Sequence, residues 1–184
     1  MTAPISSLKP GVLVETSAVR VSKAADVSRL VLRTRGALGP LNDALGVSLP
    51  QKIGNRDRTE GLEALCLGPD EWVLVGTPDG AAGILSRCGD VYESHPHSIV
   101  DISGRELTLE ISGPKASTLL TMGCARDIDQ IAPGTGRRTL FDGVTVVLWR
   151  DAPDRFRMDI WHSFVPHLMH LLDTGCKELA AETA

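Results

Sequence analysis

SIVDISGRELTLEISGPKASTLLTMGC, residues 98–124, is the stretch of the 184-residue sequence with the clearest secondary-structure pattern. Leu107, Leu109 and Ile111 alternate with polar residues, a period of two that is typical of a strand with one buried face. Ser103-Gly104 interrupts the run just before this strand, where we expect a hairpin turn after an earlier strand. The stretch therefore predicts a strand, a tight turn and a second strand.

A helix is expected directly after the second strand. Ser112-Gly113-Pro114 provides a small capping residue and a proline near the first helical position, where its missing N–H costs nothing. Leu119 and Leu120 would form the buried face, and Gly123 would end the helix. The stretch contains no recognisable catalytic set, so we interpret it as scaffold.

The residues before this stretch follow the order βαββαβ. We expect strands at residues 27–33, 61–67, 72–75 and 91–93, with a loop over 49–60. Leu38, Leu41 and Leu45 have helical spacing after the first strand, and a weak helix ending near Arg87 follows the third strand. This is the split βαβ pattern of ferredoxin-like folds, which many unrelated functions share.

The residues after position 133 predict further strands and a final helix. Residues 144–149 are almost continuously apolar and predict a central strand covered on both faces, entered through the Asp142-Gly143 hairpin turn. A half-buried strand follows at 155–160. Ser163 is expected to cap the final helix and Gly175 to end it. The buried stripe of that helix would comprise Phe164, Leu168, Leu171 and Leu172.

The sequence thus predicts an α+β fold with two small mixed modules. The first is the ferredoxin-like module of residues 26–95, and the second spans residues 96–175. Residues 1–25 are weakly patterned and are interpreted as an N-terminal arm, either a partly ordered tail or an arm that orders against a partner subunit. Residues 176–184 are interpreted as a tail.

The composition excludes several classes of protein. The net charge is −4 and aromatic residues make up 4% of the chain, whereas nucleic-acid-binding proteins usually have a basic surface and stacking aromatics. No apolar run approaches the ~20 residues of a membrane span, and the N-terminus has no secretory leader pattern. We therefore expect a soluble cytoplasmic protein that contacts neither nucleic acid nor membrane.

The four cysteines do not form a recognisable site. Cys66, Cys88, Cys124 and Cys176 contain no CxxC pair, so a zinc site or a dithiol redox motif is not indicated. They could pair as disulfides. In a cytoplasmic protein, however, four reduced and mostly buried thiols are the favoured interpretation.

Two short motifs have both a chemical and a structural interpretation. His95-Pro96-His97 could contribute to a metal site, but no carboxylate or thiol cluster accompanies it, so a turn is favoured. The segment GTGRR at 134–138 suggests a phosphate loop, which would need a helix after the glycines. A strand is expected there instead, so a turn into a strand is favoured.

The remaining polar residues suggest no active site. The sequence has no GxSxG and no GxGxxG motif, and pairs such as Asp127 and Asp129 are explained by turns. His167 and His170 are interpreted as part of a solvated helix face. The sequence predicts no catalytic, cofactor-binding or metal-ligating residue in this chain.

Several short motifs together resemble the gamma subunits of heterotetrameric sarcosine oxidases. They are LGPDEW at 67–72, DIS at 101–103, ISGP at 111–114, GC at 123–124 and LWR at 148–150. This family in turn resembles the N-terminal part of the folate-binding aminomethyltransferases, the T-proteins of glycine cleavage. The resemblance implies an aminomethyltransferase-like fold and a structural, non-catalytic role.

The resemblance also implies partners and cofactors. The complex would oxidatively demethylate sarcosine to glycine, and tetrahydrofolate on the alpha subunit would accept the one-carbon unit. FAD, FMN and NAD are expected on the larger subunits and zinc on a delta subunit, with none in this chain. Alpha is the expected direct partner of this chain, in a complex that also contains beta and delta, and residues 98–124 are a possible contact region.

One departure from the aminomethyltransferases bears on activity. Their folate site includes a GGxxDD-like hairpin strand, and the corresponding acidic positions here are Val146 and Val147. Valine cannot hydrogen-bond a pterin or stabilise a cationic intermediate. Two alternatives remain open: a free-standing folate-binding protein, and a gamma-like subunit of an oxidase for another N-methyl amine. Trp72 and Trp161 are candidate partner contacts that the core would explain equally well.

Overall fold

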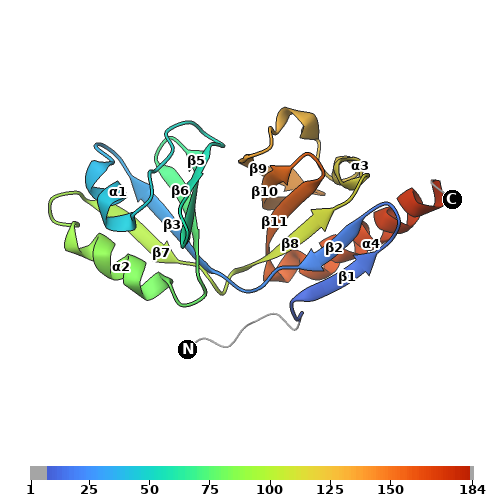
Figure 1. Cartoon of the computed structure of the whole chain (residues 1–184), viewed down its shortest axis with the longest axis horizontal. Helices are drawn as coiled ribbons and strands as arrows, with labels where there is room; N and C mark the ends of the chain where they lie inside the picture. The colour runs from blue at the N-terminus through green and yellow to red at the C-terminus, as the bar shows by residue number, and fades with distance from the viewer. Residues whose placement is uncertain (1–7, 183–184) are drawn as a thin grey trace. The chain divides into compact units, whose positions relative to one another are not determined.

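A computed structural model describes residues 8–182 and divides the chain into two compact units (Figure 1). Unit 2 is continuous and runs from Val27 to Ser103. Unit 1 is discontinuous, because it combines the chain up to Asp26 with everything from Gly104 onward. Each unit has its own sheet and its own apolar core, which confirms the predicted α+β class.

Unit 2 is the ferredoxin-like unit. In chain order it contains β3 (Ser28–Thr34), α1 (Gly39–Leu45), β4 (Arg56–Arg58), β5 (Leu62–Gly68), β6 (Glu71–Gly76), α2 (Ala81–Asp90) and β7 (His97–Asp101). The strands form one antiparallel sheet in the order β4-β5-β6-β3-β7. Apart from the added edge strand β4, this is the arrangement that the split βαβ pattern predicts.

Two predictions in unit 2 were wrong. The fourth strand is β7 and not residues 91–93, which continue the end of α2 as turns: the N–H of Val91 donates to Cys88 O over 3.2 Å. The predicted loop over 49–60 contains β4, whose charged sequence RDR gave no period-two apolar signal.

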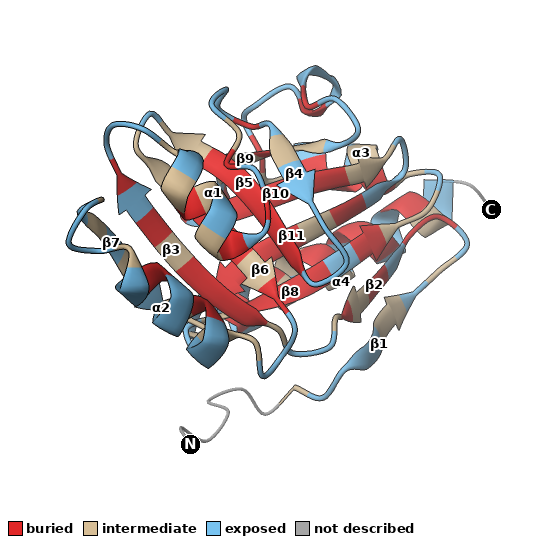
Figure 2. Cartoon of the chain, turned by 60° about the vertical axis from the view of Figure 1, so that its left-hand side comes forward, coloured by how far each residue is buried: buried red, intermediate tan, exposed pale blue. Residues whose placement is uncertain are grey.

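The core of unit 2 lies between its sheet and its two helices (Figure 2). Leu30, Leu32 and Leu74 point from the sheet toward Leu41 of α1 and Ile84 of α2. This packing explains why the short helix α1 forms: its apolar spacing gives it a buried face although no side chain caps its N-terminus.

Unit 1 is built from the two ends of the described chain. It contains β1 (Gly11–Glu15) and β2 (Arg20–Lys23), followed after unit 2 by β8 (Glu106–Ser112), α3 (Ala116–Thr121), η1 (Ile128–Gln130), β9 (Thr135–Phe141), β10 (Val144–Ala152), β11 (Arg155–Trp161), η2 (His162–Phe164) and α4 (Val165–Glu182). Its antiparallel sheet has the order β1-β2-β8-β11-β10-β9. One face of this sheet carries the larger core, with Leu109, Leu148 and Met158 packed in the same cluster as Leu168 and Leu172 of α4.

The two units have the same order of strands and helices along the chain. In unit 2 the path is β3, α1, β4, β5, β6, α2 and β7, and in unit 1 it is β8, α3, β9, β10, β11 and α4. Strand β2 pairs with β8 in unit 1 in the same way that β7 pairs with β3 in unit 2. The last strand of unit 1 is therefore supplied by sequence that precedes unit 2, which is why no repeat was recognised in the sequence.

Because β1 and β2 belong to unit 1, the predicted domain boundaries need correction. Residues 1–25 were predicted to form an arm, but β1 and β2 are strands of unit 1, and Val21 is fully buried. Residues 1–7 lie outside the described residues. The predicted boundary at residue 96 falls at 103–104 instead, because β7 completes unit 2. The predicted tail at 176–184 is, as far as Glu182, the continuation of α4.

The stretch 98–124 does contain two strands and a helix, but not a hairpin. Strand β7 belongs to the sheet of unit 2 and β8 to the sheet of unit 1, so Ser103-Gly104 marks the crossing between units. Asp101 stabilises this crossing by accepting hydrogen bonds from the N–H and hydroxyl of Ser103, at 2.9 and 2.5 Å. The helix that follows is α3, which is one turn shorter than the pattern suggested.

Two predictions at the end of the chain also need correction. Gly175 does not end α4, and Ser163 lies within η2 and does not cap α4. A Cβ on Gly175 would lie 2.6 Å from Leu119 Cδ1 and 2.7 Å from Met122 Sδ, so this glycine allows α4 to approach α3. Strand β10 was predicted to be central and covered on both faces. Val146, Leu148 and Trp149 are buried as expected, although β10 is next to the edge strand β9.

None of the helices between residues 8 and 182 combines the length and apolar character that a bilayer crossing needs.

Candidate functional site

The strongest polar constellation lies on the face of the unit 1 sheet opposite the main core. Asp159 of β11 is buried, and its Oδ1 accepts a hydrogen bond from Thr108 Oγ1 at 2.6 Å. Its Oδ2 accepts one from Trp149 Nε1 at 2.7 Å. These residues lie on β8, β11 and β10, so one carboxylate joins three adjacent strands.

An ion pair extends this constellation along the same face. Arg157 Nε and Nη2 donate to the two carboxylate oxygens of Asp151, at 2.7 and 3.0 Å. The guanidinium carbon of Arg157 is 4.7 Å from the ring centroid of Trp149. A bidentate pair stacked on an indole is fixed in geometry as well as in charge.

Chemically, this arrangement fixes the Asp159 carboxyl group as a structural part of the sheet. Both oxygens of Asp159 already accept hydrogen bonds from within unit 1. A general base needs an oxygen aimed at a substrate proton. Asp159 was not predicted as a functional residue, because its place in an alternating strand suggested a solvated face. A signal was present: a tryptophan on the neighbouring strand needs a partner for its indole N–H when it is buried.

The β9–β10 hairpin carries the two positions that correspond to the acidic residues of the aminomethyltransferase folate site. Val146 and Val147 are both buried, and Val146 belongs to the main core of unit 1. Asp142, in the turn, has a φ of +47°, which the two-residue hairpin requires. Its N–H donates to Gly123 O at 2.7 Å, and its Oδ2 is 2.6 Å from His167 Nε2. The solvated-face interpretation of His167 therefore missed a contact that fixes the hairpin to α4.

The segment 134–138 is a turn followed by a strand, as expected. Gly134 has a φ of +84°, its N–H donates to Arg150 O, and β9 begins at Thr135. Arg150 is itself buried and donates to the carbonyls of Ile128, Ile131 and Pro153 at 2.9–3.2 Å. It holds the loop before β9 against the end of β10.

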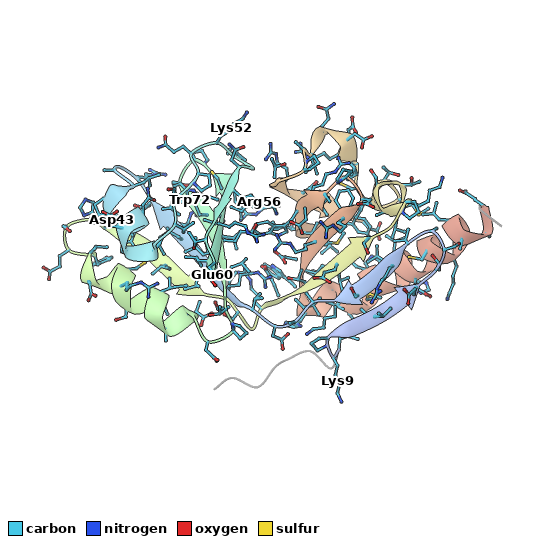
Figure 3. The ribbon with its side chains drawn as sticks, in the orientation of Figure 1. Lys9, Asp43, Lys52, Arg56, Glu60 and Trp72 are labelled. Atoms are coloured by element: carbon cyan, nitrogen blue, oxygen red, sulfur yellow. The ribbon has the colours of Figure 1, made fainter. Side chains whose placement is uncertain are left out.

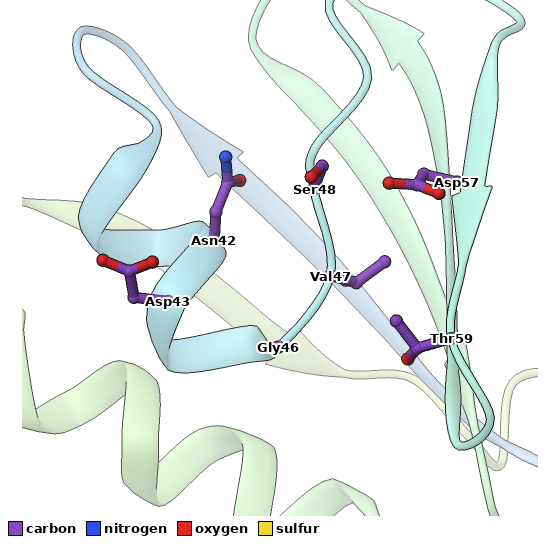
Figure 4. Close-up of a pocket in the computed structure, with 7 residues that line it drawn as sticks. All are labelled: Asn42, Asp43, Gly46, Val47, Ser48, Asp57 and Thr59. Atoms are coloured by element: carbon purple, nitrogen blue, oxygen red, sulfur yellow. The ribbon is translucent and has the colours of Figure 1, made fainter.

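An open pocket of about 430 Å³ lies in unit 2 between α1, the loop after it and β4 (Figure 4). The side chains of Val47 and Thr59 point toward one another there. Asn42 Oδ1 accepts a hydrogen bond from Leu49 N, and Asp57 Oδ1 accepts one from Arg58 N, both at 2.9 Å. Its polar groups thus hold their own loops, and we assign the pocket no ligand.

The histidine and cysteine motifs have local structural roles. His95 lies in the turn before β7, and His97 Nδ1 is 2.8 Å from His95 O. All four cysteines are buried, and none of these four described residues forms a disulfide. Within residues 8–182, no group of three or more His, Cys, Asp or Glu residues is arranged to hold a metal ion.

The turn of the LGPDEW motif is fixed by arginines from the neighbouring strand. Asp70 accepts hydrogen bonds from Arg35 Nε at 3.0 Å and Arg33 Nη2 at 3.3 Å. The hydrogen bond from Arg35 is the main reason why the pKa of the Asp70 carboxyl lies below its usual value.

The two tryptophans considered as partner contacts differ in their exposure to solvent. Trp72 is buried, and its Nε1 donates to Pro50 O at 2.7 Å, so it belongs to the core of unit 2 (Figure 3). Trp161 is 44% exposed at the end of β11, and Phe164, three residues later, is 42% exposed. The guanidinium carbon of Arg105 lies 4.9 Å from the Trp161 ring centroid. Trp161 therefore remains a candidate contact.

Comparisons with known proteins place the chain. A gamma subunit of sarcosine oxidase from Corynebacterium sp. strain P-1 is 32% identical over 153 residues, covering 80% of this chain and 73% of that protein. The chain belongs to the sarcosine oxidase gamma subunit family. The gamma subunit from Corynebacterium sp. strain U-96 is 30% identical over 174 residues, covering 91% of this chain and 84% of that protein. No family model matches the sequence.

Solved structures agree with membership of the gamma subunit family. A chain of the heterotetrameric sarcosine oxidase from Corynebacterium sp. U-96, in complex with pyrrole 2-carboxylate, has a TM-score of 0.81 and 27% identity. The match covers 92% of this chain and 89% of that one. The glycine cleavage aminomethyltransferase T of Bartonella henselae has a TM-score of 0.63 and 12% identity, covering 85% of this chain and 46% of that one. The second match shows the fold alone, and it confirms the predicted aminomethyltransferase-like architecture.

Proposed function

We propose that this chain is a non-catalytic structural subunit of a heterotetrameric sarcosine oxidase. The observation that carries the proposal is its membership of the gamma subunit family over most of the length of both sequences. The similarity to a chain of a solved heterotetrameric sarcosine oxidase supports it, with 92% of this chain covered.

A structural role is supported by the polar groups of unit 1. Asp159 accepts hydrogen bonds at both oxygens, Arg150 holds three carbonyls, and Arg157 is paired with Asp151. The hairpin positions equivalent to the acidic residues of aminomethyltransferases are buried valines. These groups stabilise strand pairing and loops, and they offer a folate no acidic partner.

The proposed reaction belongs to the other subunits. The complex demethylates sarcosine oxidatively to glycine and passes the one-carbon unit to tetrahydrofolate. FAD, FMN, NAD and tetrahydrofolate would be bound by the larger subunits and zinc by a delta subunit. Alpha is the proposed direct partner of this chain, in a complex with beta and delta. A cytoplasmic location is supported by four buried cysteines that form no disulfide among the described residues, since thiols stay reduced in that compartment.

A free-standing folate-binding protein is the alternative that the aminomethyltransferase T fold favours. Titration calorimetry of the purified full chain with tetrahydrofolate separates the two functions. The proposal predicts no heat of binding. A saturable one-to-one isotherm would instead support the alternative.

A further inference from the structure

We propose that Arg105, Trp161 and Phe164 form a docking surface for a non-identical subunit, and we call these three residues the Trp161 patch. The inference rests on the proposed function, because it names the surface through which this chain would join the oxidase. The patch lies wholly within unit 1, at the start of β8 and the end of β11.

The two aromatic residues of the patch are three positions apart in the sequence. Trp161 has extended backbone directly before the 3₁₀ turn η2, and Phe164 is the last residue of that turn. Each residue is more than two-fifths exposed. Tryptophan, phenylalanine and arginine are enriched at the centres of protein interfaces, and tryptophan and arginine are frequent hot spots.

Two residues of the patch, Trp161 and Arg105, are held in place before any partner arrives. Trp161 is paired in register with Glu106 on β8, and the N–H of His162 donates to Arg105 O at 3.2 Å. Arg105 lies over the Trp161 ring while its Nε and Nη2 donate to Glu106 Oε1, at 3.2 and 2.8 Å. Binding would therefore immobilise few additional side chains, which favours affinity.

The charges of the patch indicate what kind of partner fits it. Within the described chain, Arg105 Nη1 has no hydrogen-bond acceptor, and the nearby Glu106 carboxylate already binds the other two nitrogens. A partner with an apolar hollow for the rings and a carboxylate for Nη1 would complete the site. A second copy fits less well, because an isologous contact would bring two Arg105 side chains into the same interface. The expected occupant is thus an acidic surface of another subunit.

The test uses the full chain co-expressed with the alpha, beta and delta subunits of its own organism, with an affinity tag on alpha. A doubly substituted chain, Trp161→Ala with Phe164→Ala, is compared with Tyr92→Ala, which removes an aromatic ring that is 54% exposed in unit 2. The amount of this chain that co-purifies with tagged alpha is measured for each variant. We expect the double substitution to weaken binding and to lower this amount by roughly tenfold or more. Tyr92→Ala should bind like wild type.

A second pair of variants tests the charge. Arg105→Glu should weaken binding by roughly tenfold or more, whereas Arg105→Lys should retain more of the affinity, because it keeps the positive charge. Thermal melting of each isolated variant should stay within roughly 3 °C of wild type, which separates docking from folding.

The outcomes distinguish the inference from the function on which it rests. If wild type binds and the double variant binds equally well, the Trp161 patch is not the docking surface, although the proposed function stands. If wild type binds none of the subunits, the proposed function fails and the inference fails with it. If sedimentation shows a wild-type dimer that the double substitution disperses, the patch is a self-contact and the inference is overturned.

Discussion

The indole N–H of Trp149 donates to the carboxylate of Asp159 across 2.7 Å, between neighbouring strands, with both side chains buried. Thr108 binds the other carboxylate oxygen from the strand on the opposite side. One residue therefore ties the three middle strands of unit 1 together on the face away from its main core.

Removal of this carboxylate should destabilise the protein strongly. Asp159→Ala would leave the Trp149 N–H and the Thr108 hydroxyl buried without this acceptor, at a cost of about 2–4 kcal/mol. Urea unfolding followed by tryptophan fluorescence measures the loss. Asp173→Ala, which removes an exposed carboxylate bonded to Lys177, is the control and should stay within about 0.5 kcal/mol. Equal effects of the two substitutions would refute the structural role of Asp159.

Two helical glycines should respond oppositely to alanine. At Gly83 of α2 a Cβ would meet only the end of the exposed Arg87 side chain, at 3.4 Å, so Gly83→Ala should stabilise by about 0.5–1 kcal/mol. At Gly175 the Cβ would come within 2.6 Å of buried Leu119, so Gly175→Ala should lower stability despite the same helix propensity. Chemical denaturation of both variants tests this, and stabilisation by Gly175→Ala would contradict the close helix approach.

The thiols should give the protein an alkaline limit. Burial, with a smaller contribution from Asp173, raises the pKa of the Cys176 thiol to about 11 from the ordinary value of 9.0. The stability that comes from keeping this thiol protonated is complete below pH 9 and is lost as the pH rises toward 11. Cys176→Ala should flatten the fall of stability with pH over this window. An unchanged slope would show that Cys176 does not contribute.

Strand β2 precedes unit 2 in the sequence but belongs to the sheet of unit 1, and this predicts which fragments of the chain can fold. Residues 27–103 contain every strand of the unit 2 sheet, so this fragment should give a cooperative melt. A chain that begins at residue 27 should lose the fold of unit 1, because it lacks β2, which pairs with β8, and the buried core residues Val19 and Val21. Limited proteolysis with mass spectrometry checks both fragments. A protease-resistant unit 1 in the truncated chain would contradict the requirement of unit 1 for β2.

Local patterns were sufficient for most of the elements but not for their partners. The alternation in β8 and β11 and the helical spacing in α1 predicted those elements, because each needs one buried face. The pairing of β2 with β8 joins residues that are 86 to 92 positions apart, from Lys23 with Leu109 to Arg20 with Ser112, and no local pattern encodes that contact. For the same reason the Ser103-Gly104 turn was interpreted as a hairpin, although it connects two sheets.

The polar constellations were harder to predict than the elements. Asp159 has the position of a solvated strand residue, and only its neighbours Trp149 and Thr108 on other strands show that it is buried. The Trp161 patch depends on the meeting of the first residues of β8 with the end of β11. In contrast, the motifs from LGPDEW to LWR indicated the family correctly, because they report common ancestry and not a local structural requirement.

Co-expression of the alpha, beta and delta subunits with and without this chain shows whether the chain is a structural subunit, when sarcosine turnover and the mass of the purified complex are measured. We expect the chain to co-purify in a one-to-one ratio with alpha, and its omission to yield an unstable, incompletely assembled oxidase. A fully active complex of normal stability that forms without the chain would contradict this structural role.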